Sequence, residues 1–175
     1  MFAAALKQAG MNVSAYDRLQ NDPKHARHQI EKTESLGVSV TDSAAEAVRD
    51  ARLVISTVTA SEAVNAASDA LPGLHAGCHW LDLNSISPET KGRVRATVES
   101  AGAGFTEAVA MDTVPSKGVQ VPILMCGPES AQWSDVLNSA GMNTRALGDS
   151  PGLASTTKLL RSVIIKGMEL SLIHI

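Results

Sequence analysis

Lys158 is the residue with the clearest capacity for chemistry in this sequence. It lies near the start of a long, largely apolar helical pattern that follows Pro151-Gly152. A lysine in such a helix usually extends its ammonium group into solvent. Inside a cleft that excludes water its pKa falls, and it can then exchange protons near neutral pH. A regular helix would place Ser162 on the same face as Lys158, one turn further on.

Polar residues also follow two apolar runs that are typical of buried strands. Ser56, Thr57 and Val58 end the run that begins at Leu53, and Asn84-Ser85 follows the run 80–83. In an open parallel α/β sheet, ligands bind beyond the carboxyl ends of the strands, so we expect these groups to face a ligand. Each group also has a local explanation, because such residues frequently cap helices or form turns.

An acid and a base, Asp17 and Arg18, end a short alternating run near the start of the chain, 12–18. At the end of the second strand of a dinucleotide-binding sheet, Asp17 could accept hydrogen bonds from both hydroxyls of an adenosine ribose. Arg18 could stack on the adenine or contact a ribose phosphate, so the pair leaves NAD against NADP open. The alternative for Asp17 is an ordinary turn acid that caps the following segment.

The elements that must position these residues alternate along the chain. Apolar runs predict strands, helical patterns separate most of them, and glycine or proline marks the breaks between them. This rhythm predicts an α/β fold with a parallel sheet. The predicted strands are 12–18, 38–40, 53–58, 80–83, 105–109, 119–126 and 143–147, and the predicted helices are 2–9, 24–36, 43–50, 59–71, 88–101, 129–139 and 153–175.

Composition narrows the class of protein. Of the 175 residues 44% are hydrophobic and 19% are charged, and the net charge is -3, which argues against broad attraction to nucleic acid or to a membrane surface. No apolar segment approaches the ~18–20 residues of a membrane helix, and no signal peptide is recognisable, so we expect a cytoplasmic protein. Cys78 and Cys126 lie in or beside apolar runs and are expected to be buried free thiols. The histidines have no zinc-ligand spacing, and we expect no metal site.

Five blocks in this order resemble the β-hydroxyacid dehydrogenases, the family related to 6-phosphogluconate and 3-hydroxyisobutyrate dehydrogenases. The blocks are 6–18, 53–58, 81–88, 105–109 and 152–169. The last block carries Arg161-Ser162 after Lys158 and ends in Lys166-Gly167-Met168-Glu169, as in one subgroup of the family.

The resemblance implies a Rossmann-like dinucleotide-binding domain over 1–150, then a long interdomain helix, 151–175, that starts a helical substrate and dimerisation domain. It implies NAD or NADP as cofactor, a small hydroxyacid as substrate, and a homodimer or higher oligomer. Lys158 would be the general acid/base. The cofactor-binding residues would be Asp17, Arg18, Ser56, Thr57, Val58 and Asn84, and the substrate-binding residues would be Ser85 and Ser162.

The sequence also departs from the family pattern. The Gly-x-Gly-x-x-Gly turn is absent, and with it the helix N-terminus that would bind the pyrophosphate. The first strand, which should lie at the centre of the sheet, is missing too, and its loss should leave two strand edges unpaired. Met111-Asp112-Thr113 replaces a Ser-Gly-Gly turn, and Arg161-Ser162 replaces Asn-Asn. We therefore expect a fragment of a longer dehydrogenase with impaired cofactor binding.

Three functions are compatible with these observations. The leading hypothesis is an NAD(P)-dependent oxidoreductase of small hydroxyacids. The alternative is a non-catalytic α/β binding or assembly module that uses its exposed apolar helix for partners. A third is a different adenosine-cofactor enzyme, such as a methyltransferase, with Asp17 on a ribose; the lysine motif around Lys158 favours the first over the third.

Overall fold

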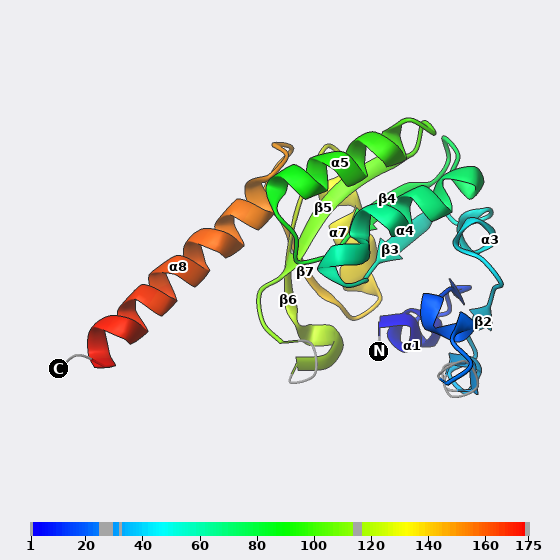
Figure 1. The fold of residues 1–175 in the computed structure, drawn as a ribbon, viewed down its shortest axis with the longest axis horizontal. Coiled ribbons are helices and arrows are strands. Elements are labelled where there is room, and N and C mark those ends of the chain that lie inside the picture. Colours follow the sequence, from blue (N-terminus) through cyan, green and yellow to red (C-terminus); the bar gives the residue numbers. More distant parts are fainter. Residues whose placement is uncertain (1, 25–29, 32, 114–116, 174–175) are drawn as a thin grey trace.

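The computed structural model describes residues 2–24, 30–31, 33–113 and 117–173. Helices cover both faces of a sheet, and one long helix projects away from the remainder of the chain (Figure 1). The strands are β1 (Ser14–Ala15), β2 (Ser39–Val40), β3 (Leu53–Ser56), β4 (His79–Asp82), β5 (Gly104–Ala110), β6 (Pro122–Cys126) and β7 (Asn143–Ala146). The α-helices are α1 (Phe2–Gln8), α3 (Ala44–Val48), α4 (Ala63–Ala70), α5 (Pro88–Glu99), α7 (Ser130–Ser139) and α8 (Leu153–Ile173). The predicted helix 24–36 lies partly outside the described residues.

The main sheet has five strands in the order β3-β4-β5-β6-β7. β3, β4 and β5 are parallel and are joined by the crossover helices α4 and α5, as the alternating pattern predicts. β6 runs antiparallel to β5, and β7 is parallel to β6 at the edge of the sheet. The carboxyl ends of β3, β4 and β5 therefore meet at one edge, where the sequence places its polar residues.

Side chains that alternate along the strands divide the core into two layers. On β4, Leu81 packs in the layer that includes α7 and Leu6 of α1, whereas Trp80 packs in the layer beneath α4 and α5. Both residues are buried, as are all four residues of β4. A strand covered on both faces buries every side chain, so its two polar residues, His79 and Asp82, need buried partners, which are Thr106 for His79 and Lys91 for Asp82.

Local signals set most of the helix boundaries. Gly10 adopts a φ of +81°, the left-handed conformation that follows the end of α1. Ser43 Oγ accepts a hydrogen bond from Glu46 N at 3.1 Å, and Ser87 Oγ accepts one from Thr90 N at 3.2 Å. The predicted helix 59–71 begins later than expected, because a 3₁₀ turn, η2 (Ala60–Glu62), precedes α4 and the Thr59 side chain makes no capping hydrogen bond.

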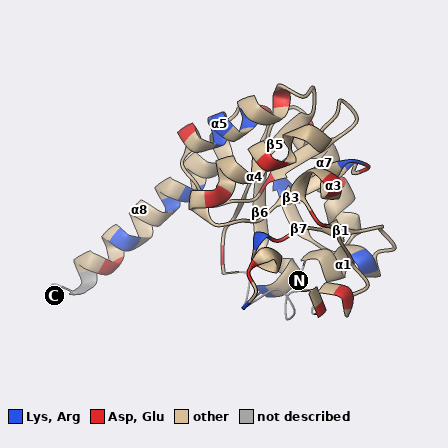
Figure 2. Ribbon diagram, turned by 45° about the vertical axis from the view of Figure 1, so that its right-hand side comes forward, with Lys and Arg blue, Asp and Glu red and all other residues tan. Residues whose placement is uncertain are grey.

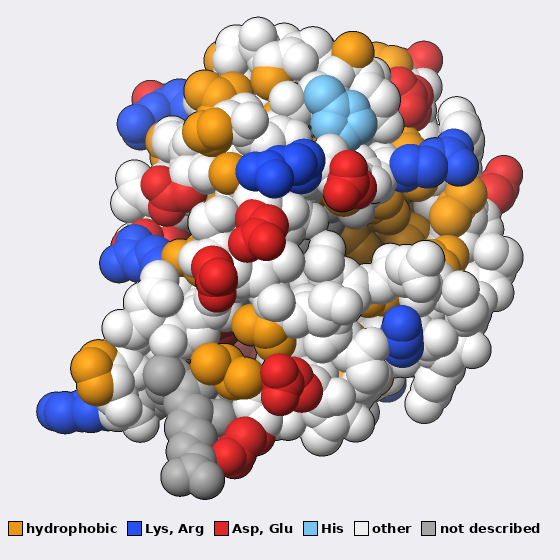
Figure 3. Space-filling view, turned by 90° about the vertical axis from the view of Figure 1, so that its right-hand side faces the viewer, with side chains coloured by type: hydrophobic (Ala, Val, Ile, Leu, Met, Phe, Trp, Pro, Cys, Tyr) orange, Lys and Arg blue, Asp and Glu red, His pale blue; other side chains and the backbone are white. Residues whose placement is uncertain are grey.

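β1 and β2 form a separate parallel pair, and among the described strands neither pairs with the main sheet. β3 is consequently an edge strand of the five-stranded sheet, so the expectation of two unpaired edges is confirmed. Seen from the side of β2 and α3, the surface is hollowed and hydrophobic side chains line the hollow (Figure 3). Ser14 Oγ on β1 donates a hydrogen bond to Ala47 O at 2.9 Å, which ties the small pair to α3.

The surface carries both signs of charge. Acidic and basic residues are interspersed over the elements, and neither sign gathers on one of them (Figure 2). In the described part of the chain, no helix combines the length and apolar character needed to cross a membrane. Cys78 and Cys126 are buried free thiols, as predicted.

Candidate active site

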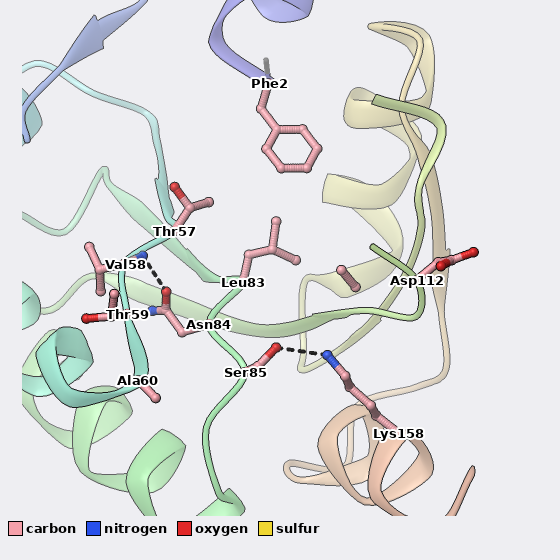
Figure 4. A pocket seen from close by; sticks show the side chains of 11 residues that line it. Phe2, Thr57, Val58, Thr59, Ala60, Leu83, Asn84, Ser85, Asp112 and Lys158 are labelled. Atoms are coloured by element: carbon pink, nitrogen blue, oxygen red, sulfur yellow. Dashed lines mark hydrogen bonds between the residues drawn. The ribbon is translucent and has the colours of Figure 1, made fainter. Parts of the chain in front are cut away.

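A cavity of about 500 Å³ opens at the carboxyl ends of β3 and β4 (Figure 4). Residues that follow these strands form one wall, and Lys158 of α8 reaches in from the opposite side. The lining residues are Phe2, Thr57, Val58, Thr59, Ala60, Leu83, Asn84, Ser85, Ala110, Asp112 and Lys158. The topology therefore brings together Thr57, Val58, Asn84, Ser85 and Lys158, five of the predicted site residues.

Asn84 holds the ends of β3 and β4 together beneath the cavity. Its Oδ1 accepts from Val58 N at 2.7 Å, and its Nδ2 donates to Ser56 Oγ at 2.9 Å and to Asp82 Oδ2 at 3.2 Å. Because Asn84 and Ser56 are buried, these polar groups are satisfied inside the protein. Ser56 does not line the cavity, and it instead accepts a hydrogen bond from the lining residue Asn84.

Lys158 donates a hydrogen bond from Nζ to Ser85 Oγ at 2.8 Å. Burial, and secondarily the positive charge of Lys91, lower the pKa of Lys158 from its ordinary value. Both effects disfavour the ammonium form, which is the condition under which a lysine exchanges protons closer to neutral pH. Figure 4 shows the Lys158 side chain directed toward Ser85, while the Asp112 carboxylate points away from it.

Lys91 and Asp82 form a buried ion pair that sequence reasoning missed. Lys91 Nζ donates to Asp82 Oδ1 at 2.7 Å, to Asp82 O at 2.9 Å and to Ala108 O at 2.9 Å, which uses all three ammonium protons. The bonds fasten α5 to β4 and β5, and Asp82 immediately precedes the lining residues Leu83 and Asn84. The spacing of residues in the sequence could have revealed it, because Lys91 lies on the same buried face of α5 as Val94 and Val98.

Glu107 is a second buried charged residue near the site that the sequence analysis did not identify. It lies within β5 and is almost fully buried, and its carboxylate accepts hydrogen bonds from the start of α8. Its signal in the sequence is an acid inside an apolar strand, which is rare unless the acid has a buried partner.

Besides Ser56, the structure places three predicted residues outside the cavity. Asp17 Oδ1 accepts from Leu19 N at 2.9 Å and caps the 3₁₀ turn η1 (Arg18–Asn21), which is the alternative considered for it. The Arg18 guanidinium forms an ion pair with Glu62, which joins the turn η1 to the turn η2 that follows β3. Ser162 is half-buried one turn beyond Lys158 and does not line the cavity.

The sequence matches a known family over most of its length. Residues 1–144 match the NAD binding domain of 6-phosphogluconate dehydrogenase. The chain belongs to this family. The membership agrees with the Rossmann-like arrangement of the parallel strands and with a cavity at their carboxyl ends.

Solved structures of similar proteins extend this result. A conserved hypothetical protein from Sinorhizobium meliloti 1021 is 33% identical with a TM-score of 0.92, and the match covers 99% of this chain and 57% of that protein. A conserved protein of unknown function, described as similar to 3-hydroxyacid dehydrogenases, is 32% identical with a TM-score of 0.81, covering 95% of this chain and 60% of that one. This member of the 6-phosphogluconate dehydrogenase family thus spans somewhat more than half the length of its relatives.

The fold is shared with a more distant enzyme that binds nicotinamide cofactors. An imine reductase from Myxococcus stipitatus, solved as a variant with NAD⁺, is 16% identical with a TM-score of 0.82 and covers 99% of this chain and 59% of that one. The same enzyme in complex with NADP⁺ is 20% identical with a TM-score of 0.75, covering 99% and 58%. At these identities the likeness concerns the fold.

Proposed function

We propose that this chain is the cofactor-binding part of an NAD(P)-dependent oxidoreductase of small hydroxyacids, with Lys158 as its general acid/base. The observation that carries the proposal is the position of the Lys158 ammonium, 2.8 Å from Ser85 Oγ in a cavity bounded by the ends of β3 and β4. Family membership supports the cofactor class. The cavity, in turn, brings a proton-exchanging group to the position where parallel α/β sheets bind ligands.

The residues around the cavity fit the nicotinamide end of such a cofactor. Thr57, Val58 and Thr59 are exposed at the end of β3, and the buried Asn84 amide fixes the backbone of Val58 at 2.7 Å. When bound there, the cofactor would accept or donate a hydride. Asp17 and Arg18 would lie toward the adenosine ribose, once Arg18 is released from Glu62.

The protein's own share of the reaction is proton transfer and placement. Lys158, with its pKa lowered by burial, would take the proton from the substrate hydroxyl as the alcohol is oxidised and return it in the reverse direction. Ser85 would hold the lysine beside the substrate, and Ser162 would lie at the rim, one turn along α8. In the step as a whole, the alcohol loses a hydride to the cofactor and a proton to Lys158, and it becomes a carbonyl group.

The sequence contains no Gly-x-Gly-x-x-Gly turn, so we propose that this chain binds NAD or NADP only weakly. Such a turn supplies the backbone amides and helix N-terminus that stabilise a pyrophosphate. Titration calorimetry of the chain with each cofactor measures this directly. A low-micromolar dissociation constant would contradict the proposed impairment.

We further propose that α8 leads from the domain over 1–150 into a helical domain that completes the substrate cleft and mediates dimerisation. The supporting observation is the apolar surface of α8, which projects from the main body (Figure 1). The exposed apolar side chains are Leu159, Leu160, Val163, Ile164, Ile165, Met168 and Leu170. The same surface favours the second candidate function, a non-catalytic assembly module.

Turnover separates the two candidates. A longer protein that includes the proposed helical domain, its Lys158→Ala variant and its surface control Lys24→Ala are assayed for cofactor reduction with a panel of small 2- and 3-hydroxyacids. General acid/base catalysis contributes roughly 10²–10⁴-fold, so Lys158→Ala should lose at least about 100-fold in kcat while cofactor affinity is retained. Unchanged turnover in Lys158→Ala would remove it from the mechanism. Cofactor binding without turnover on any acid would favour the assembly module.

A further inference from the structure

One buried carboxylate joins the sheet to the start of α8. Glu107 Oε2 accepts a hydrogen bond from Gly152 N at 2.8 Å, and Glu107 Oε1 accepts from Ser155 N and Ser155 Oγ, both at 2.6 Å. The first amides of a helix have no partner within the helix, and a negative charge is favoured beside them. A cap usually comes from a neighbouring residue, but here it comes from β5, 45 to 48 residues earlier in the chain.

The other contacts at this end of α8 are mainly apolar packing, with Ala154 in a cluster with Val109 and Cys126. Ala154 is buried and donates its backbone N–H to Cys126 Sγ at 3.4 Å, and the helix packs against β5 and β6. From Leu159 to Leu170 the apolar side chains are exposed, so packing along that stretch cannot set the rotation of the helix. A second hydrogen bond holds α8 further along the helix, where Arg161 Nη1 donates to Met111 O, just after β5, at 2.6 Å.

Lys158 follows Ser155 by three residues and therefore lies about one turn further along the same helix face. We propose that Glu107 is the positioning residue for Lys158: its carboxylate fixes the rotation and height of the first turn of α8, and thereby places the Lys158 ammonium beside Ser85. The catalytic relevance of that position rests on the proposed function, in which Lys158 is the general acid/base. The placement itself is a property of the free chain and can be measured without turnover.

Side-chain length matters in this arrangement. A shorter acid at position 107 would withdraw the carboxylate by about one carbon–carbon bond, ~1.5 Å, beyond hydrogen-bonding range of an amide now at 2.8 Å. An amide of the same length keeps one acceptor oxygen for Ser155, but turns an N–H₂ group toward Gly152 N. Glu107→Gln should therefore loosen the start of α8 partly, and Glu107→Ala should loosen it more.

The test follows the titration of Lys158 in the whole chain. Lysine ¹³Cε resonances are recorded against pH for wild type, Glu107→Ala and Glu107→Gln, with Lys158→Arg assigning the signal. Because burial is the main reason why the Lys158 pKa is lowered, displacement of α8 should move it toward the ordinary value of 10.5, further in Ala than in Gln. Amide hydrogen exchange over 152–158 should accelerate at least ~10-fold in Glu107→Ala.

A matched control separates positioning from general stability. Thr144→Val breaks a buried cluster between α7 and β7, in which Thr144 Oγ1 lies 2.8 Å from Ser134 Oγ and 2.9 Å from Asn138 Oδ1. It should lower the melting temperature and leave the Lys158 titration unchanged. Should Glu107→Ala not fold, Glu107→Gln carries the same comparison.

Two outcomes overturn the inference: a Lys158 titration that is the same in the Glu107 variants as in wild type, or an equal shift in Thr144→Val. Failure of the proposed function would look different. In that case the Glu107 variants would still shift the titration, while Lys158→Ala retained turnover.

Discussion

Replacing Lys91 with methionine removes the positive charge that lies between α5 and the ends of β4 and β5. The side chain of Lys91 is 2% exposed and that of Asp82 is 0% exposed, and their charged atoms are 2.7 Å apart. Methionine fills a similar volume, but it leaves the Asp82 carboxylate buried. Among the described residues, only Asn84 then donates hydrogen bonds to it, from its backbone N–H at 3.1 Å and its side-chain amide at 3.2 Å. The perturbation is therefore an uncompensated buried charge.

The expected cost follows from that burial. Removing one partner of a buried pair typically costs about 3–5 kcal/mol, because the remaining charge stays desolvated. For a domain of this size each kcal/mol lowers the melting temperature by about 2–4 °C, so Lys91→Met should melt roughly 6–20 °C below wild type. The two carbonyl oxygens that now accept from Lys91, Asp82 O and Ala108 O, also lose their partner.

Urea denaturation followed by circular dichroism measures the free energy of unfolding, and Arg95→Met is the matched control. Arg95 is on the same helix and pairs with Glu99 at 2.6 Å on the surface, where an ion pair contributes less than about 1 kcal/mol. The double variant Asp82→Asn/Lys91→Met removes both charges and should be more stable than Lys91→Met alone. In Lys91→Met, loss of the nearby positive charge should also raise the pKa of Lys158.

Two results would refute this reasoning. One is a Lys91→Met cost no larger than that of Arg95→Met. The other is additivity in the double variant, which would mean that the two charges do not depend on each other.

Four further predictions concern pH, cofactor choice and association. Burial lowers the pKa of His79 below 6.5, so the unfolded chain binds more protons there and the stability should decrease as the solution is acidified. In thermal melts from about pH 7 to 5, His79→Gln should lose less stability than wild type. Burial also lowers the pKa of Lys158, so stability should rise with pH between that lowered value and 10.5, and melts of Lys158→Met should lack this rise. Glu62 pairs with Arg18, so Glu62→Gln should raise the affinity for 2′,5′-ADP relative to 5′-AMP about 2–5-fold in calorimetry, and an unchanged ratio would exclude Glu62 from cofactor choice. The apolar surface of α8 should cause self-association, which light scattering should find reduced in Ile164→Glu; a wild-type monomer at high concentration would count against it.

Much of the fold could be predicted because its signals are local. Alternating runs, capping serines and glycine stops depend on residues a few positions apart, and they located the strands and most helix boundaries from Gly10 to Ser87. The pattern also indicated which edge of the sheet carries polar groups, since parallel strands share their carboxyl ends. It failed at the start of the predicted helix 59–71, where the chain forms a 3₁₀ turn before α4, because residue pattern alone does not fix the backbone conformation at a helix start.

By itself the sequence determined the alternation of strands and helices, the polar residues at strand ends and the lysine motif on α8. Only the tertiary structure decided which of those residues meet. It brought Lys158 to Ser85 across 73 positions, left Asp17 as a cap and paired Arg18 with Glu62. It also revealed the buried partners of Lys91 and Glu107, which join α5 and α8 to the sheet. A buried charge is recognised by the partner that compensates it, and chain packing, not sequence spacing, supplies that partner.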